Sequence, residues 1–292
     1  MGRRMLPTDK EVLALVPGPG SVTWLRAADA CTLIAAGYAL VLQVAHPTVG
    51  IGVAEHSRYR EDPWERLART LDFTTALLYA EPAVAAAAAR ELRARHARIR
   101  GTRPDGSRYH ALEPAAFAWV WASLYEAIAA AHRHFGSPMP RDAEERFWIE
   151  WRRLGRLLGV RERDLPATLE GYGDYFDRIV YDVLEDNESV QGVLATLGQP
   201  ACPPALRRLG PAWKLGTMPG AHALRLATAG LLPHVLRERF GLGWTLAQEL
   251  ELRALGAATR TAALVVPERL RAFGPSYLRW RGHGNRPRKA AA

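Results

Sequence analysis

The chain has 292 residues, of which 48% are hydrophobic and 24% are charged, a globular composition that excludes a disordered protein. The net charge is +9, but the basic residues are almost all arginines and no nucleic-acid-binding motif accompanies them, so we expect no nucleic-acid partner. Cys31 and Cys202 lie in no metal-binding or cofactor-attachment motif, and the first residues lack the core of a signal peptide. We therefore expect a cytoplasmic protein.

Residues 17–21 form a turn, after which an apolar stretch over residues 27–45 predicts a buried core helix. Asp29 and Gln43 interrupt this stretch, and it is too short to span a membrane, so we expect no membrane span. The helix is predicted to end before Pro47, because a residue that precedes proline is disfavoured in the α conformation.

The next part of the chain contains two clear helix N-terminus signals. In the sequence Asp62-Pro63-Trp64-Glu65, Asp is a good N-cap, Pro suits the first helical position and Glu completes a capping box. This helix is predicted to run to about Tyr79. Glu81-Pro82 begins the next helix, which is predicted to continue through a run of alanines to about Arg100 and to end at Gly101.

The remaining pattern predicts an all-α fold. Residues 101–109 are predicted to form a loop and 198–219 an irregular segment, and further helices are predicted over residues 114–135, 142–158, 168–185, 220–240 and 245–264. The expected organisation is an N-terminal extension over residues 1–20, a single multi-helix domain over 21–278 and a basic flexible tail over 279–292.

Several enzyme classes leave sequence signatures that are missing here. The chain contains no HExxH zinc motif, no phosphate-binding P-loop, no dinucleotide-binding GxGxxG and no GxSxG nucleophile motif. A di-iron bundle needs Glu-x-x-His pairs, and no glutamate here has a histidine three residues later. The remaining candidates for a functional site are histidines and arginines at helical spacing.

One such group lies on the predicted helix after Pro82. Steps of three and four residues place along one side Ala85, Ala89, Leu92, Arg93, His96 and Arg100. The alanines offer a flat surface to a planar macrocycle, the two arginines suit carboxylates, and imidazole is a common ligand of haem iron. The helix dipole favours a charged imidazole at this position by about 1 kcal/mol, and an exposed basic helix end is the alternative interpretation.

The preceding helix carries a second candidate group. Arg66, Thr70, Phe73 and Leu77 share one face, with Arg69 beside it. Arg66 and Thr70 could donate hydrogen bonds to an oxygen ligand above an apolar patch. The alternative is a surface arginine and a threonine that bonds its own helix backbone.

Four segments together resemble a known family. They are SVTWLRAADACTLIAAGYALVLQVAHPTVGIGVAEHS, DPWERLARTLDF, RARHARIRGT and WRRLGRLLG, in that order. In order and spacing, over roughly residues 20 to 270, they are similar to the "domain of unknown function 2236" family, which contains the latex-clearing rubber oxygenases and the MpaB-type oxygenase.

The resemblance implies a helical fold with non-covalent haem b. The family's proximal histidine lies in an Arg-x-x-His-x-x-x-Arg pattern that is matched here by Arg93, His96 and Arg100, with Ala89 and Phe73 expected beside the cofactor. The family's distal Arg-x-x-Lys-Thr motif corresponds to Arg66, Arg69 and Thr70. Arg69 stands where the family has lysine and cannot ligate iron. Glu55 is the loose match to the family's catalytic glutamate.

The expected function is that of a haem b-dependent oxygenase that uses O2 and an apolar small molecule, with olefinic or isoprenoid compounds as one class. A haem-binding or gas-sensing protein without turnover is the first alternative. A non-haem metal enzyme that uses His46, Glu55, His56 and His96 is the second, and a purely structural helical protein is the third. We expect His46 and His56 to be structural or pocket-lining residues and His132 to lie in the core or at its rim.

Overall fold

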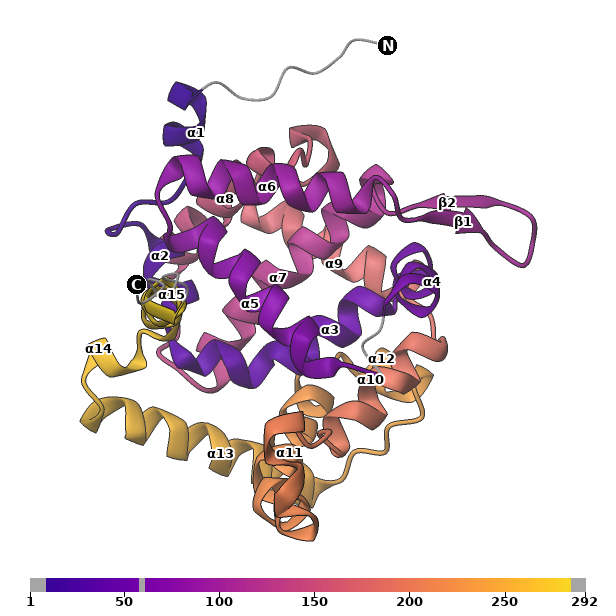
Figure 1. The fold of residues 1–292 in the computed structure, drawn as a ribbon, viewed down its shortest axis with the longest axis vertical. Coiled ribbons are helices and arrows are strands. Elements are labelled where there is room, and N and C mark those ends of the chain that lie inside the picture. The colour runs from indigo at the N-terminus through magenta and orange to yellow at the C-terminus, as the bar shows by residue number, and fades with distance from the viewer. Residues whose placement is uncertain (1–8, 58–60, 285–292) are drawn as a thin grey trace, which may run out of the picture.

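The computed structural model describes residues 9–57 and 61–284, which form one packed group of helices with a small β-hairpin that projects from one side (Figure 1). The first half of the chain contains α1 (Asp9–Leu15), α2 (Val22–Ala28), η1 (Ala30–Ala35), α3 (Ala36–Val44), α4 (Pro47–His56), α5 (Pro63–Tyr79), α6 (Pro82–His96), β1 (Arg100–Thr102) and β2 (Arg108–His110). The second half contains α7 (Pro114–His134), α8 (Arg141–Leu158), η2 (Glu162–Asp164), α9 (Leu169–Asp182), α10 (Glu188–Gly198), η3 (Pro204–Leu209), α11 (Pro211–Leu231), α12 (His234–Arg239), α13 (Leu246–Val265), α14 (Glu268–Arg271) and α15 (Phe273–Gly284). The predicted all-α class is confirmed.

The core forms around α7, which packs against η1, α3 and α8. Trp119 and Trp121 of α7 are buried, and the indole of Trp119 donates a hydrogen bond of 2.8 Å to the carbonyl of Leu42 on α3. Trp121 and Trp151 of α8 stack with ring centroids 4.4 Å apart, and each indole donates to the other's backbone carbonyl. Tryptophan supplies large apolar area while its N–H is satisfied, so these pairs fix how the helices cross.

The predicted starts of α5, α6 and α13 are confirmed, but of the capping box predicted for α5 the described residues show only the half made by Asp62. The Asp62 carboxylate accepts a hydrogen bond from the backbone N–H of Glu65, and Pro63 is the first residue of α5. Thr245 and Gln248 form a reciprocal capping box at the start of α13. At the C-terminus of α8, Gly159 has a φ of 86°, the left-handed conformation that ends many helices.

The predicted path differs from the structure in the hairpin and in α6. Helix α6 ends at His96 rather than near Arg100, and Arg100 begins β1, where it pairs with His110 of β2. The segment from 101 to 109 therefore contains an antiparallel hairpin instead of a loop. A short turn between two three-residue strands gives little alternating pattern, which is why the sequence did not reveal it.

The segment over residues 198–219 is also more regular than predicted. Helix α11 begins at Pro211, passes through Pro219 and ends at Leu231, and α12 follows separately. Leu215 and Pro219 are both exposed, so water can bond the carbonyl that proline leaves without a donor. Helix α10 was not predicted, although the Asn187 side chain caps it by accepting from the backbone N–H groups of residues 189 and 190.

Both ends of the predicted domain carry further helices. Helix α1 lies within the expected extension and packs against α6 and α8, with Val12 and Leu15 buried. Helix α15 packs against α5 and continues past Arg279 to Gly284. The rest of the extension, residues 1–8, and of the tail, residues 285–292, lies outside the described residues.

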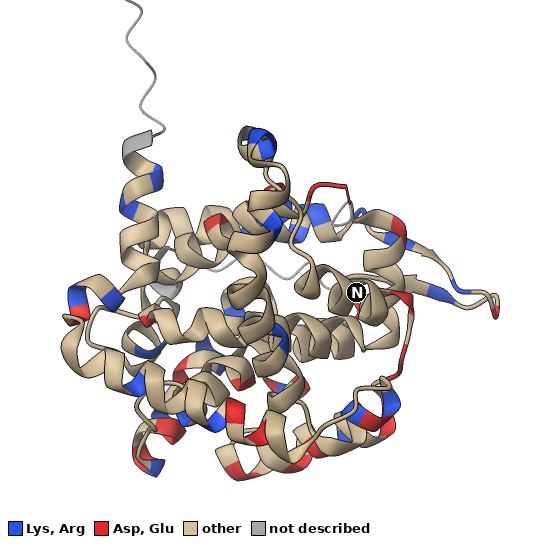
Figure 2. Ribbon diagram, turned by 90° about the horizontal axis from the view of Figure 1, so that it is seen from below, with Lys and Arg blue, Asp and Glu red and all other residues tan. Residues whose placement is uncertain are grey.

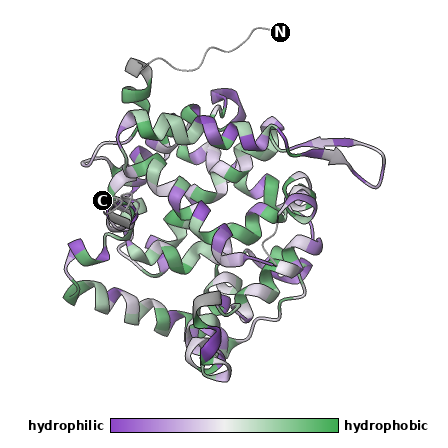
Figure 3. Ribbon diagram, viewed as in Figure 1, coloured by the Kyte–Doolittle hydropathy of each residue, from purple (hydrophilic) through white to green (hydrophobic). Residues whose placement is uncertain are grey.

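Acidic and basic residues are interspersed among uncharged ones over the helices seen from below in Figure 2, and the hairpin carries both signs. Apolar positions concentrate on the inner helices but also run along α13 at the lower edge of the molecule (Figure 3). Within the described residues, no single helix has the length and hydrophobicity to cross a membrane. One bent pair, Ala30–Val44 with Pro47–His56, passes that test by length and composition, with an angle of 101° between its parts.

Candidate functional site around His96

His96 ends α6 in a state suited to binding a metal. Its Nδ1 lies 2.9 Å from the carbonyl oxygen of Leu92, and because a carbonyl only accepts, Nδ1 carries the proton. The lone pair is therefore on Nε2, which has no hydrogen-bond partner in the part of the chain that the structure describes. Burial lowers the pKa of His96 below its ordinary value, which favours the neutral ring. This burial opposes the effect expected from the helix dipole.

The imidazole faces an apolar strip on α7. The ring of His96 meets Phe117 edge to face, with centroids 6.0 Å apart. Between residues 116 and 132 every residue of α7 is buried except four, which are only partly buried and are spaced by three, four and four residues: Phe117, Val120, Leu124 and Ile128. That spacing places the four on one helix face. We call it the accessible strip. It gives a partly buried apolar face of α7 whose first residue, Phe117, meets His96.

A polar trio lies close to the same end of α6. The hydroxyl of Tyr109 on β2 donates to the carboxylate of Glu55 at the end of α4, and His56 Nε2 lies 3.0 Å from the same hydroxyl. Burial, together with the Glu55 carboxylate, raises the pKa of Tyr109 to about 12, so the phenol stays protonated. A side chain at Gly101 would collide with Tyr109 and Glu55, which explains a glycine at this point of β1. The trio therefore fixes Glu55 beside the segment that follows His96.

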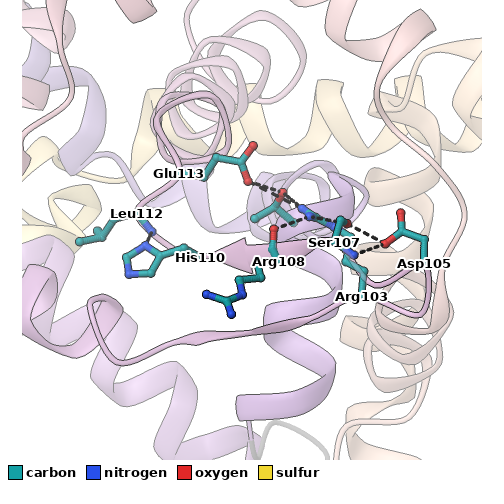
Figure 4. A network of polar contacts seen from close by, with 8 residues as sticks. Arg103, Asp105, Ser107, Arg108, His110, Leu112 and Glu113 are labelled. Atoms are coloured by element: carbon teal, nitrogen blue, oxygen red, sulfur yellow. Dashed lines mark hydrogen bonds and ion pairs between the residues drawn. The ribbon is translucent and has the colours of Figure 1, made fainter.

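The turn of the hairpin is tied to the residue before α7 by a second network (Figure 4). Arg103 donates to the hydroxyl of Thr48 over 2.7 Å, and that hydroxyl donates to the carboxylate of Glu113 over 2.9 Å. Glu113 is the residue before α7, so the network sets where the helix bearing Phe117 begins. His46 lies near these charges and is buried; burial lowers its pKa, and its Nδ1 has no partner among the described residues. The expected pocket-lining role of His46 stays a prediction.

The residues of α5 predicted to lie on the distal side of the cofactor differ in their contacts and exposure. Arg66 donates to the hydroxyl of Ser57, which follows the C-terminal end of α4. Ser57 comes two residues after Glu55 in the chain. Thr70 is exposed and its hydroxyl bonds the carbonyl of Arg66, which is the backbone interaction considered as the alternative. Arg69 is exposed, with its Nε 3.8 Å from Glu65.

The proposed surroundings of His96 on α6 itself do not have the predicted geometry. Arg93 donates over 2.8 Å to the carbonyl of Leu158, so it closes the C-terminus of α8 instead of flanking the imidazole. Arg100 lies on β1 rather than one helical turn beyond His96. Ala85 and Ala89 are buried in the protein core, so the alanine surface is covered by protein. Phe73 of α5 is partly buried against that core.

The remaining candidates have clear positions. His132 is buried, and its Nε2 lies 2.9 Å from the carbonyl of Arg26, as expected of a core histidine. Within the described residues, no three or more His, Cys, Asp or Glu side chains are grouped so as to hold a metal ion. The non-haem set of His46, Glu55, His56 and His96 is thus not assembled as a metal centre.

A family model matches residues 24–261, which is most of the chain. Its description is "ER-bound oxygenase mpaB/B'/Rubber oxygenase, catalytic domain". The chain belongs to this oxygenase family. The family places the chain among oxidoreductases and confirms the resemblance seen in the sequence. The comparisons with curated proteins and with solved structures give no significant match to this chain.

Sequence reasoning missed two residues that the structure brings to the site. Tyr109 fell in a segment that was predicted to be a loop, and its contact with Glu55 crosses 54 positions of sequence. Phe117 and Trp121 are four residues apart on α7, but Trp121 is buried against α8 while Phe117 faces His96. Only tertiary packing separates the two residues.

Proposed function

We propose that this member of the oxygenase family is haem b-dependent and acts with O2 on an apolar small molecule, with olefinic or isoprenoid compounds as the first class to test. The observation that carries the proposal is the neutral His96, whose Nε2 is unpartnered among the described residues and which stands at the start of the accessible strip. A neutral imidazole with its other nitrogen held by a carbonyl is the usual form of a histidine ligand. The donor chemistry therefore fits a haem iron.

When bound, haem supplies the activation of O2, which amino-acid side chains cannot perform. His96 holds the cofactor, and the carbonyl of Leu92 fixes the plane and tautomer of its ring. The accessible strip supplies apolar contacts that orient a hydrocarbon and exclude water. Because Arg93 is bonded to α8 and Arg100 lies on β1, we assign neither of them to the carboxylates of the cofactor.

Glu55 and Arg66 are the polar side chains that we propose for the reaction. Tyr109 donates to one oxygen of the Glu55 carboxylate and so orients it, while 44% of that side chain remains exposed and available to a proton. Arg66 is held at the end of α4 by Ser57 and provides a permanent positive charge. We assign no contact with oxygen to Thr70, because its hydroxyl is bonded to its own helix.

The test is the haem content of protein expressed with ample iron and haem precursor. The purified protein should show a Soret band, and His96→Ala should lose that band and regain it with added imidazole. His134→Ala is the matched control, because His134 is exposed at the C-terminal end of α7. An unchanged spectrum and haem content in His96→Ala would refute the ligand assignment.

Turnover is tested separately by giving reduced protein O2 and unsaturated isoprenoids, with carbonyl products as the readout. Products that disappear in Glu55→Gln support the proposed role of the carboxylate. Haem without any products across such substrates would favour the haem-binding protein without turnover.

A further inference from the structure

A cavity lies away from His96, between α10, α11 and the segment that precedes α13. Its volume is about 510 Å³, which is within the usual range for sites that bind small organic molecules. Its walls are mainly aliphatic, from Leu194 and Leu197 on α10, Leu226 and Ala229 on α11, and Leu242 on the connecting segment. None of these residues belongs to the site around His96.

One lining residue carries a charge that nothing in the described residues neutralises. Arg225 has no hydrogen-bond or ion-pair partner within residues 9–57 and 61–284, and its side chain is exposed at the cavity. Its aliphatic stem lies over Gly198, where an added Cβ would be 2.9 Å from Arg225 Cδ. The glycine at the end of α10 thus leaves room for the arginine to lie along the cavity instead of pointing away from it.

The other polar side chains of the lining already have partners. His222 Nε2 is 2.6 Å from the carboxylate of Glu251, and the hydroxyl of Thr228 donates over 2.7 Å to the carbonyl of Leu224. Gln248 accepts from Thr245 in the capping box of α13. A ligand therefore meets one available guanidinium at the edge of an aliphatic cavity.

We propose that this cavity binds an aliphatic carboxylate, with the carboxylate on Arg225 and the hydrocarbon chain between α10 and α11. Guanidinium binds carboxylate through charge-assisted hydrogen bonds, and the aliphatic walls have no polar group that the chain would leave unpaired. A hydrocarbon cation is disfavoured, because its charge would lie beside Arg225. The proposal does not depend on haem binding or on turnover.

Dodecanoate is the probe, titrated into the purified full-length protein by calorimetry, with dodecanol and dodecyltrimethylammonium for comparison. Dodecanoate should bind one per chain, and Arg225→Gln should weaken it about tenfold, the low end for a charge-assisted bond at an exposed arginine. Arg90→Gln is the control and should bind normally, because Arg90 is exposed on α6 and also has no partner in the described part of the chain. Equal affinity for dodecanol, or an unaltered affinity in Arg225→Gln, would overturn the proposal.

The location is tested by two further variants. Ala229→Trp fills the cavity and should abolish dodecanoate binding, whereas His96→Ala should leave it unchanged. The reverse pattern would place the probe in the site around His96 and refute the second site. Should Ala229→Trp not fold, Arg225→Glu replaces it, since that residue is exposed and the variant should lose dodecanoate and gain the ammonium compound.

Discussion

Replacing Gly155 with alanine tests whether the Trp121–Trp151 pair fixes the packing of α7 on α8. A Cβ at position 155 would lie 2.6 Å from Trp121 Nε1 and 2.8 Å from its Cδ1, closer than real Cβ contacts. The indole cannot withdraw freely, because it is stacked on Trp151 and its N–H is bonded to that residue's carbonyl over 2.9 Å. The substitution must therefore displace a buried, hydrogen-bonded ring.

The expected cost follows from these contacts. Overpacking costs about 1–3 kcal/mol, and a buried indole N–H left without a partner costs about 1–3 kcal/mol. Alanine regains about 1 kcal/mol over glycine inside a helix. We expect Gly155→Ala to lower the free energy of unfolding by about 3 kcal/mol, the sum of these effects.

Urea denaturation followed by tryptophan fluorescence measures this change, provided that the denaturant dependence stays the same in both proteins. Gly173→Ala is the control, because a Cβ at that exposed position of α9 meets nothing within 4 Å. It should stabilise the protein by about 0.5–1 kcal/mol. A Gly155→Ala variant as stable as the wild type would show that the indole pair is not fixed in the way described.

Three further predictions concern the site and its supports. Burial lowers the pKa of His46 in the folded protein, so below the ordinary pKa of about 6.5 the unfolded chain binds more protons than the folded one. The free energy of unfolding should therefore fall between pH 6.5 and 5.5, by at most about 1.4 kcal/mol per pH unit from this residue. Urea denaturation midpoints should fall less over this range in His46→Gln. Arg93→Gln should lower the melting temperature, because the loss of its charged hydrogen bond should reduce the free energy of unfolding by about 1.5–3 kcal/mol. The haem content should stay the same. Reduced haem retention would instead mean that Arg93 contacts the cofactor. Tyr109→Phe should cost about 1 kcal/mol and reduce turnover through a misoriented Glu55, whereas unchanged turnover in a stably folded variant would remove the positioning role.

Much of the fold follows from local chemistry in the sequence. The Asp62-Pro63 start of α5 and the Thr245 start of α13 were predictable because side chain and backbone interact within one turn. Pro219 misled the prediction of α11, since the cost of a proline inside a helix depends on whether solvent reaches the freed carbonyl. Local sequence does not contain that information.

The candidate site was predictable in its main residue but not in its surroundings. His96 was found because its type and spacing are visible in the sequence, and its neutral tautomer follows from a bond within the same helix to Leu92. The role of Arg93 was not predictable, because its partner is a backbone carbonyl 65 positions away on α8. The contact of Tyr109 with Glu55 likewise depends on how the hairpin folds back on α4.

The difference in burial between α7 and α13 implies that the two helices unfold locally with different free energies. Helix α7 is enclosed along most of its length, whereas α13 has only Leu252 and Gly256 fully buried. Backbone amides of α13 should therefore exchange with solvent deuterium well before those of α7, through fluctuations that leave the centre intact. Gln248, in the first turn of α13, also borders the cavity that Arg225 lines. Fraying of this turn should therefore change one wall of the cavity while the packing around α7 stays intact.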